Sequence, residues 1–257
     1  MEAEKEVRQL QKRLQELAEK SSRQNIYTFT GFLGMAELDV FHRMERELSY
    51  AHPMLFGGSE QAERLLVRFG DPEEMGYEEE FPIALLKIEP AMQKYADALG
   101  HRDVLGALMH LGIERDTLGD IFLKDNCAYL FCLDSIADFI AGELGRVKHT
   151  DVKCRRAEMS GELIRQEKVR QSLTVSSERA DVVIAGLYHL SRTQSVELFR
   201  TQKVFVNGRI CENNSCFLKK GDAVSVRGRG KFFYDGADRE TKKGKLSVGI
   251  LLYENNG

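Results

Sequence analysis

Residues 177–194 read Ser177-Glu-Arg-Ala-Asp-Val-Val-Ile-Ala-Gly-Leu-Tyr-His-Leu-Ser-Arg-Thr-Gln194, and two further segments follow, Val204-Phe-Val-Asn-Gly-Arg209 and Leu218-Lys-Lys-Gly-Asp-Ala-Val-Ser-Val-Arg-Gly228. Together these segments decide the fold of the last third of the 257-residue chain. The first has the three- and four-residue apolar spacing of short helices, and the other two combine strand-forming residues with turn residues. The pattern predicts two short helices followed by hairpins.

The two helices can be placed from their apolar face and their start signal. Val183, Leu187 and Leu190 predict one face of the first helix. Ser191-Arg-Thr-Gln194 matches a capping box, in which the Ser side chain caps an amide three residues on and the Gln side chain reaches back. We therefore expect a second helix from Ser191 to about Gln202.

Turn signals place the strands that follow. Asn207-Gly208 lies between two short apolar runs, which is typical of a tight hairpin. Lys220-Gly221-Asp222 predicts a turn into a strand at residues 223–226. Alternating apolar residues at 246–252 predict a closing strand after a loop at Asp235–Lys245. Basic residues gather at these junctions, and such a surface suits folded RNA.

The middle of the chain has the pattern of a second fold. It predicts, in order, a strand at Ile83–Ile88 stopped by Pro90, a helix at Met92–Leu111, strands at Asp120–Leu123 and Ala128–Leu133 around a turn, a helix at Ser135–Leu144 with Ile136, Phe139 and Ile140 on one face, and a strand at Thr150–Arg155. The order β-α-β-β-α-β is that of ferredoxin-like and RRM-like folds. RNA-binding RRMs carry aromatic residues on their central strands, and Phe122, Tyr129 and Phe131 are the candidates here, without the usual glycine-rich context. We interpret this domain mainly as a scaffold.

The remaining segments are less distinctive. Val7, Leu10, Leu14 and Leu17 predict an amphipathic helix over residues 2–20. We expect it to dock on its own domain, which is commoner than a coiled-coil seam of this length. Residues 156–175 are charged and indicate a linker or a helix. We expect an α+β protein with a mostly helical amino-terminal region at 1–80, a ferredoxin-like (RRM-like) domain at 81–160 and a small α+β domain at 176–257.

Composition and charge narrow the class of protein. The chain is 42% hydrophobic and 30% charged, which is typical of a folded protein and not of a disordered one. Its apolar runs are too short to cross a bilayer, no signal-peptide pattern is present, and five Cys argue against a disulfide framework, so we expect a cytoplasmic protein. Residues 176–257 hold 14 of the 37 Lys and Arg and 9 of the 40 Asp and Glu, so they carry +5 and the first 175 residues −8. A polyanion would be attracted to the carboxy-terminal part.

Several motifs together support a family resemblance. Arg179-Ala-Asp181, Leu190-Ser-Arg192, Val204-Phe-Val-Asn-Gly208, Lys219-Lys-Gly-Asp222 and Arg227-Gly228 resemble, in order and spacing, the S-four RNA-binding domain, which is named after the fourth protein of the small ribosomal subunit. Upstream, Thr30-Gly-Phe-Leu-Gly34, Gly100-His-Arg-Asp-Val-Leu-Gly-Ala-Leu108 and Leu111-Gly-Ile-Glu-Arg-Asp-Thr-Leu-Gly-Asp-Ile121 resemble the YlmH family, as does Thr241-Lys-Lys-Gly-Lys-Leu246. The resemblance covers nearly the whole chain.

The resemblance implies binding to structured rRNA or tRNA on the ribosome, in particular the large subunit, without catalysis. Related stand-alone S-four proteins sit on stalled large subunits that still hold peptidyl-tRNA and assist their rescue. The residues expected to contact RNA are Arg179, Ser191, Arg192, Gln194, Arg200, Lys203, Asn207, Lys219, Lys220, Arg227, Arg229 and Lys231, with Arg102 as a possible further contact.

These residues differ in how well the fold alone would explain them. Ser191 and Gln194 are explained by capping, and Asn207 by its turn. Arg179 and Arg192 stand at helix starts, where a cation opposes the helix dipole, which favours an outside phosphate. For Arg179 an ion pair with Asp181 is the alternative. The series from Lys219 to Lys231 is too dense to serve hairpins alone.

The sequence carries only weak signals for a catalytic, metal or cofactor site. His101-Arg102-Asp103 could be an acid–base set, but consecutive helical residues point in different directions and no nucleophile stands nearby. The Cys pairs 127 and 132, and 211 and 216, lie among apolar residues without His, so core packing is favoured over zinc. No Walker loop or GxGxxG motif is present, so no cofactor is expected. An RNA-modifying enzyme targeted by its S-four domain, and a protein-interaction adaptor, remain the alternative functions.

Overall fold

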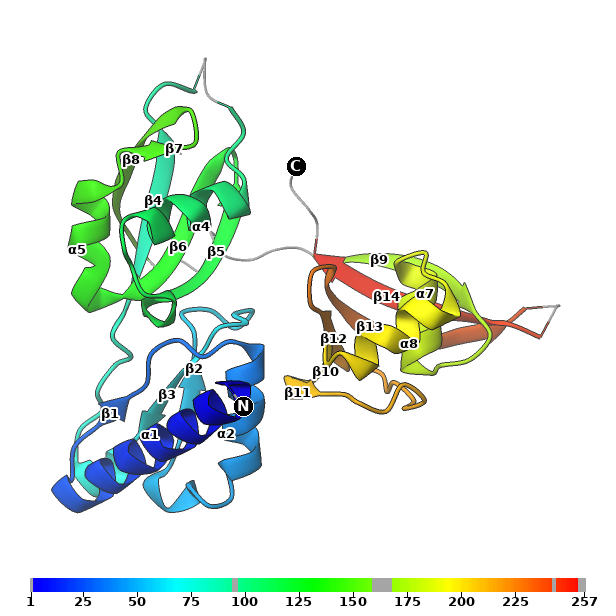
Figure 1. The fold of residues 1–257 in the computed structure, drawn as a ribbon, viewed down its shortest axis with the longest axis horizontal. Coiled ribbons are helices and arrows are strands. Elements are labelled where there is room, and N and C mark those ends of the chain that lie inside the picture. The colour runs from blue at the N-terminus through cyan, green and yellow to red at the C-terminus, as the bar shows by residue number, and fades with distance from the viewer. Residues whose placement is uncertain (1, 94–96, 159–167, 242–243, 254–257) are drawn as a thin grey trace. The chain divides into compact units, whose positions relative to one another are not determined.

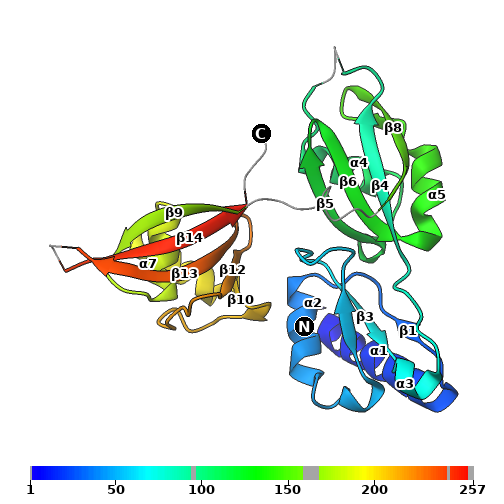
Figure 2. The ribbon, with the colours of Figure 1, turned by 180° about the vertical axis from the view of Figure 1, so that it is seen from behind.

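The computed structural model describes residues 2–93, 97–158, 168–241 and 244–253. The chain forms two compact units, the first of which ends at residue 165 and the second of which begins at residue 166. Within the described residues, no helix has both the length and the apolar character needed to span a membrane. Figures 1 and 2 show the fold of each unit from opposite sides.

The amino-terminal part of the first unit places two helices on a small sheet. Its elements are α1 (Glu2–Gln24), β1 (Thr28–Phe29), α2 (Met35–Met44), the 3-10 turn η1 (Ser49–Ala51), β2 (Met54–Phe56), β3 (Leu66–Phe69) and α3 (Pro72–Met75). The strands form an antiparallel sheet in the order β1-β3-β2, which the sequence analysis did not predict. Leu14 and Leu17 are buried in one cluster with Phe41 and Phe69, so the predicted amphipathic helix docks on its own unit.

The rest of the first unit has the predicted order of strands and helices. Its elements are β4 (Ile83–Pro90), α4 (His101–His110), the 3-10 turn η3 (Arg115–Thr117), β5 (Leu118–Lys124), β6 (Cys127–Leu133), α5 (Asp134–Glu143), β7 (Arg146–Val147) and β8 (Thr150–Ala157). The strands lie in the order β5-β6-β4-β8-β7, with antiparallel neighbours throughout. Both helices pack on one face of this sheet, where Val104, Leu108 and Ile140 join its core.

Two details of this part differ from prediction. The helix expected at Met92–Leu111 begins only at His101, with Gly100 as its extended N-cap. The described residues just before it are not helical because Leu99 is buried and its amide donates to the Asn126 side chain (2.9 Å); residues 94–96 lie outside the described part. In α5, Ile140 is fully buried but Phe139 is 51% exposed, so the two do not share a buried face.

The other face of the middle sheet is covered by the amino-terminal part of the same unit. Phe131 on β6 is fully buried and shares a cluster with Phe32 and Leu66. Gly58 lies so close that a β-carbon there would stand 2.3 Å from the Phe131 ring. Tyr129 is 7% exposed in the same cluster. The aromatic residues that an RRM would present to RNA bases are therefore largely enclosed by protein.

The second unit is a six-stranded sheet with two helices on one face (Figures 1 and 2). Its elements are β9 (Lys168–Val175), α7 (Ala180–Leu187), α8 (Arg192–Arg200), β10 (Val204–Val206), β11 (Arg209–Ile210), β12 (Ala223–Val226), β13 (Gly230–Glu240) and β14 (Leu246–Tyr253). The order is β11-β10-β12-β13-β14-β9, and all neighbours are antiparallel. The core joins Val183 and Phe199 from the helices to Val224 and Phe232 from the sheet.

The predicted helices, turns and closing strand of this unit are confirmed, but two segments were misjudged. Residues 168–175 are not a linker or a helix, because they form β9, which pairs along the whole of β14. The expected loop at Asp235–Lys245 is mostly strand, because β13 continues to Glu240 through two register shifts. Both errors concern polar strands whose pairing partner is distant in sequence.

Candidate nucleic-acid interface

Arg179 is held in place by a buried carboxylate. It is the N-cap residue of α7, and its guanidinium donates two hydrogen bonds to Asp181, at 3.0 and 2.7 Å. Asp181 is 3% exposed and also accepts from the Asn214 side chain at 3.0 Å. Burial alone would raise the pKa of the Asp181 carboxyl, but the hydrogen bonds from Arg179 and Asn214 outweigh burial and lower this pKa. Arg179 therefore makes the ion pair with Asp181 that the sequence offered as an alternative, so its place at a helix start does not by itself require an outside phosphate.

Arg179 and Arg192 line one pocket. It has a volume of about 390 Å³, and Ser176 and Ser177 also contribute to its wall. Arg192 is the first residue of α8, is exposed, and makes no ion pair within the described part of the chain. The Asp181 carboxylate, which pairs with Arg179, also lines the pocket. The two guanidinium groups and the two hydroxyl groups can each donate hydrogen bonds to a phosphate.

The capping box at the start of α8 is confirmed. The Ser191 hydroxyl accepts from the Gln194 amide at 3.2 Å, and the Gln194 side chain accepts from the Ser191 amide at 2.9 Å. Each of the two side chains is hydrogen-bonded to the backbone amide of the other residue. They therefore fix the start of α8, where Arg192 lies, and are not directed toward a ligand.

Four of the remaining predicted cations are exposed and take part in no ion pair among the described residues: Lys203, Lys219, Arg227 and Arg229. The Arg227 amide donates to the Lys203 carbonyl at 2.8 Å, one residue beyond the Val204–Val226 pair of β10 and β12. Lys203 and Arg227 thus face each other just beyond the ends of these two strands, where like charges repel, so the fold alone does not account for this pair. A bound polyanion would remove this repulsion.

The other predicted contacts have partners within the protein. Arg200 pairs with Glu197 (2.9 Å), and Lys220 pairs with Asp235 (3.2 Å). The Asn207 side chain donates to Asp222 and accepts from the Ala223 amide, both at 2.9 Å, so it joins two turns, as a turn residue should. Lys231 is half-buried, with its ammonium 5.5 Å from the centre of the Phe233 ring.

Arg102 belongs to the first unit. It lines a groove of about 570 Å³ between α4 and the turn after α5, together with His110, Arg146 and Lys148. Burial, then Arg115 and Arg102, lower the pKa of His101, and Asp103 lies 3.8 Å from Lys148. No described contact joins His101 to Asp103, so the two do not form an acid–base pair.

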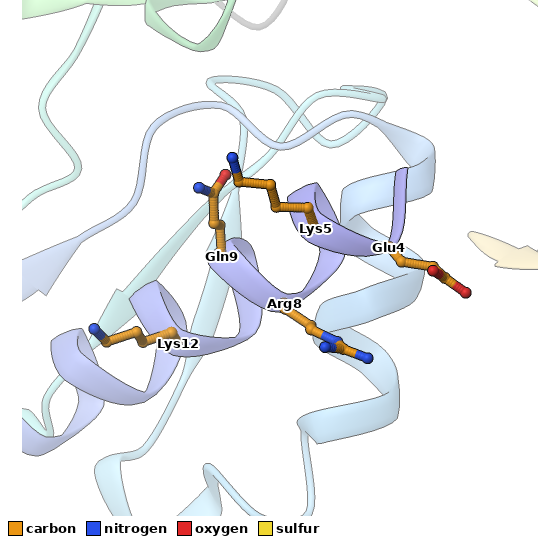
Figure 3. Close-up of a pocket in the computed structure, with 5 residues that line it drawn as sticks. All are labelled: Glu4, Lys5, Arg8, Gln9 and Lys12. Carbon is orange, nitrogen blue, oxygen red and sulfur yellow. The ribbon is translucent and has the colours of Figure 1, made fainter. Parts of the chain in front are cut away.

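Three other clusters of polar or sulfur groups lie elsewhere. A hollow on α1 is lined by Glu4, Lys5, Arg8, Gln9 and Lys12, which project from successive turns (Figure 3). His52, Asp71 and Glu74 form a mostly exposed group that the sequence analysis did not single out. The Cys211 and Cys216 sulfurs lie 3.2 Å apart at the edge of the apolar core, as core packing predicts.

The fold and the surface define a modular α+β protein with an exposed group of cations on its carboxy-terminal unit, which is typical of proteins that bind polyanions. A family model described as "Putative RNA-binding domain in YlmH" matches residues 76–161. The "Ribosome-associated protein quality control protein P2" of Bacillus subtilis (strain 168) is 32% identical over 200 residues, which are 75% of this chain and 74% of that protein. The chain therefore belongs to the YlmH family. The solved structure titled "Cell division protein ylmH from Streptococcus pneumoniae" is similar with a TM-score of 0.46 and 18% identity, over 60% of this chain and 92% of that chain.

Proposed function

We propose that this chain is a non-enzymatic RNA-binding factor that binds structured rRNA and tRNA on the ribosome. The observation that carries the proposal is the arginine pocket of the second unit, together with exposed cations of the same unit that make no ion pair among the described residues. The Bacillus subtilis relative supports it, since its name places that protein on the ribosome in protein quality control.

The domain assignments belong to the same proposal. Residues 176–257 act as an S-four-type domain, with β9 added at the edge of its sheet. Residues 81–160 form a ferredoxin-like, RRM-like domain whose covered sheet makes it a scaffold for residues 1–80. Any RNA contact of this middle domain would use its helical side, where Arg102, Arg146 and Lys148 border a groove.

In this proposal, cations of the second unit hold the RNA backbone. Asp181 fixes the Arg179 guanidinium, so little side-chain entropy is lost when Arg179 meets a phosphate. Arg192 also lines the pocket and adds a second fork of donors. Lys203, Arg227 and the nearby cations then neutralise further phosphates, which makes the affinity depend on salt. These contacts recognise the shape of the RNA backbone and not its sequence.

Binding to the large subunit, and to stalled subunits that carry tRNA, is the biological setting that we propose. Co-sedimentation of the protein with separated 30S and 50S subunits, followed by crosslink mapping, tests it. We expect the protein in the 50S fraction, with crosslinks from the second unit. An equal distribution between the subunits would refute the assignment.

The absence of catalysis is tested separately. Mass spectrometry of rRNA from cells with and without the gene should show the same set of modified bases. A modification that disappears with the gene would favour the alternative of an RNA-modifying enzyme.

A further inference from the structure

Phe217 is the exposed phenylalanine of the second unit. Its side chain is 66% exposed, whereas Phe199, Phe205 and Phe232 are at most 1% exposed. It follows Cys216 in the loop between β11 and β12 and directly precedes the buried Leu218. The apolar core of the unit does not include it. Its ring is therefore not needed to fill the fold.

The backbone places Phe217 beside Arg179. The two residues form an isolated antiparallel bridge. The flanking hydrogen bonds run from the Ala180 amide to the Cys216 carbonyl (2.8 Å) and from the Leu218 amide to the Glu178 carbonyl (3.0 Å). This is the non-hydrogen-bonded type of antiparallel pair, in which the two side chains leave on the same face and their β-carbons lie close together. Phe217 therefore stands next to a wall of the arginine pocket.

The Asp181 carboxylate contacts both Arg179 and the loop that carries Phe217. Asp181 accepts from Arg179 and from Asn214, and Asn214 belongs to the loop that carries Phe217. The Asp181 amide also donates to the Asn214 carbonyl (3.2 Å). The Arg179 guanidinium and the loop that carries Phe217 are thus tied to the same residue before any ligand arrives.

We propose that Phe217 stacks on an unpaired base of the bound RNA while the Arg179–Arg192 pocket holds a neighbouring phosphate. The inference rests on the proposed function and adds the ligand class to it. A base inside a duplex has both faces covered by its neighbours, whereas a loop, a bulge or a strand end offers a face to an aromatic ring. The site therefore takes structured RNA with an unpaired nucleotide beside the helix, with little preference among the four bases.

The test uses the full chain and two RNA hairpins with the same stem and the same tetraloop, which differ only in that one carries a single bulged nucleotide in its stem. The variants are F217A, F217L and F217W, with R192A as the control for the phosphate contact. Because Phe217 is exposed, all three Phe217 variants should keep the wild-type melting temperature. That measurement separates binding effects from unfolding.

We expect F217A and F217L to bind the bulged RNA roughly 5- to 150-fold more weakly, the range set by loss of one base–aromatic stack. F217W should bind like the wild type. The salt dependence should stay unchanged in the Phe217 variants, because stacking neutralises no phosphate, and should shrink in R192A on both RNAs. Quenching of 2-aminopurine at the bulge by the wild type, but not by F217A, would locate the stack.

Two results would overturn the inference while leaving the proposed function intact. One is wild-type affinity of F217A for the bulged RNA. The other is full affinity of F217L, which would indicate an apolar contact and not an aromatic stack. Failure of the wild-type protein to bind either RNA would instead refute the proposed function, and this inference with it.

Discussion

Replacing Gly58 with Ala tests whether the amino-terminal part is seated on the middle sheet. Gly58 has a φ of +91°, a conformation that L-residues rarely adopt. A β-carbon there would lie 2.3, 2.5 and 3.0 Å from three atoms of the Phe131 ring. Phe131 is fully buried between Gly58 and the sheet core, so the ring has no open space to enter.

The expected cost has two parts. The left-handed backbone costs a non-glycine residue about 1–2 kcal/mol. Overpacking against a buried ring, which must move with its neighbours, adds about 1–3 kcal/mol. Together they predict that G58A lowers the unfolding free energy of the first unit by about 2–5 kcal/mol.

The structure offers a matched control in Gly76. It has a φ of +74°, and a β-carbon there would meet nothing within 4 Å. G76A should therefore show the backbone part alone. Combining G58A with F131A should give less than the sum of the two single effects, because the small side chain removes the overlap. Urea unfolding of the full chain measures the costs, and hydrogen exchange of β6 and β14 amides assigns each transition to its unit. If G58A costs no more than G76A, Phe131 is not packed against this loop.

Three further predictions concern named side chains. Replacing Arg192 with Ala should leave stability unchanged and should reduce the slope of log affinity against log salt by roughly one unit. Replacing Ser191 with Ala should instead cost about 1 kcal/mol of stability, because the helix cap is lost. Melting curves and salt-dependent RNA binding distinguish the two variants. Replacing Arg179 with Ala should destabilise the second unit most at neutral pH. The pKa of Asp181 is lowered in the folded state, so the ionised carboxylate stabilises the fold above about pH 4, and this contribution is lost as the pH falls through the folded-state pKa. A loss of stability that stays constant on acidification would contradict this. Burial raises the pKa of Cys132 to about 12, so mass spectrometry should find it alkylated by iodoacetamide only on unfolding, and rapid labelling of the native protein would contradict its burial.

Local signals accounted for much of the second unit. The capping box at Ser191 and the Asn207-Gly208 turn are formed by residues close in sequence, and the structure has both as predicted. β9 escaped prediction because its exposed charged residues lack apolar alternation and its strand is defined by pairing with β14, far along the chain. The helix at α4 was placed too early because Leu99 continues the apolar pattern while being buried outside the helix.

The structure brings some of the predicted contact residues together and gives others partners within the fold. Charge and motif place Arg179 and Arg192 together, and the structure brings both into one pocket. Helix-dipole reasoning missed that Asp181, two residues on, is buried and compensates Arg179. Asn214 and Phe217 were not singled out, because contacts with residues far away in sequence place them near Arg179: Phe217 forms a β-bridge with Arg179, and the Asn214 side chain donates to Asp181. The only sequence signal was an aromatic residue just before a basic turn.

The pairing of β9 with β14 sets Lys168 opposite Tyr253, so the first and last described strand residues of the second unit are neighbours. A unit whose two ends meet at one edge of its sheet can be spliced into or onto another polypeptide with a minimal joint. It can also be circularly permuted, with the old ends fused and new ones opened at the Asn207-Gly208 turn, where the chain already reverses at the surface. The second unit can therefore be moved to another protein as one domain that keeps the arginine pocket and Phe217 together.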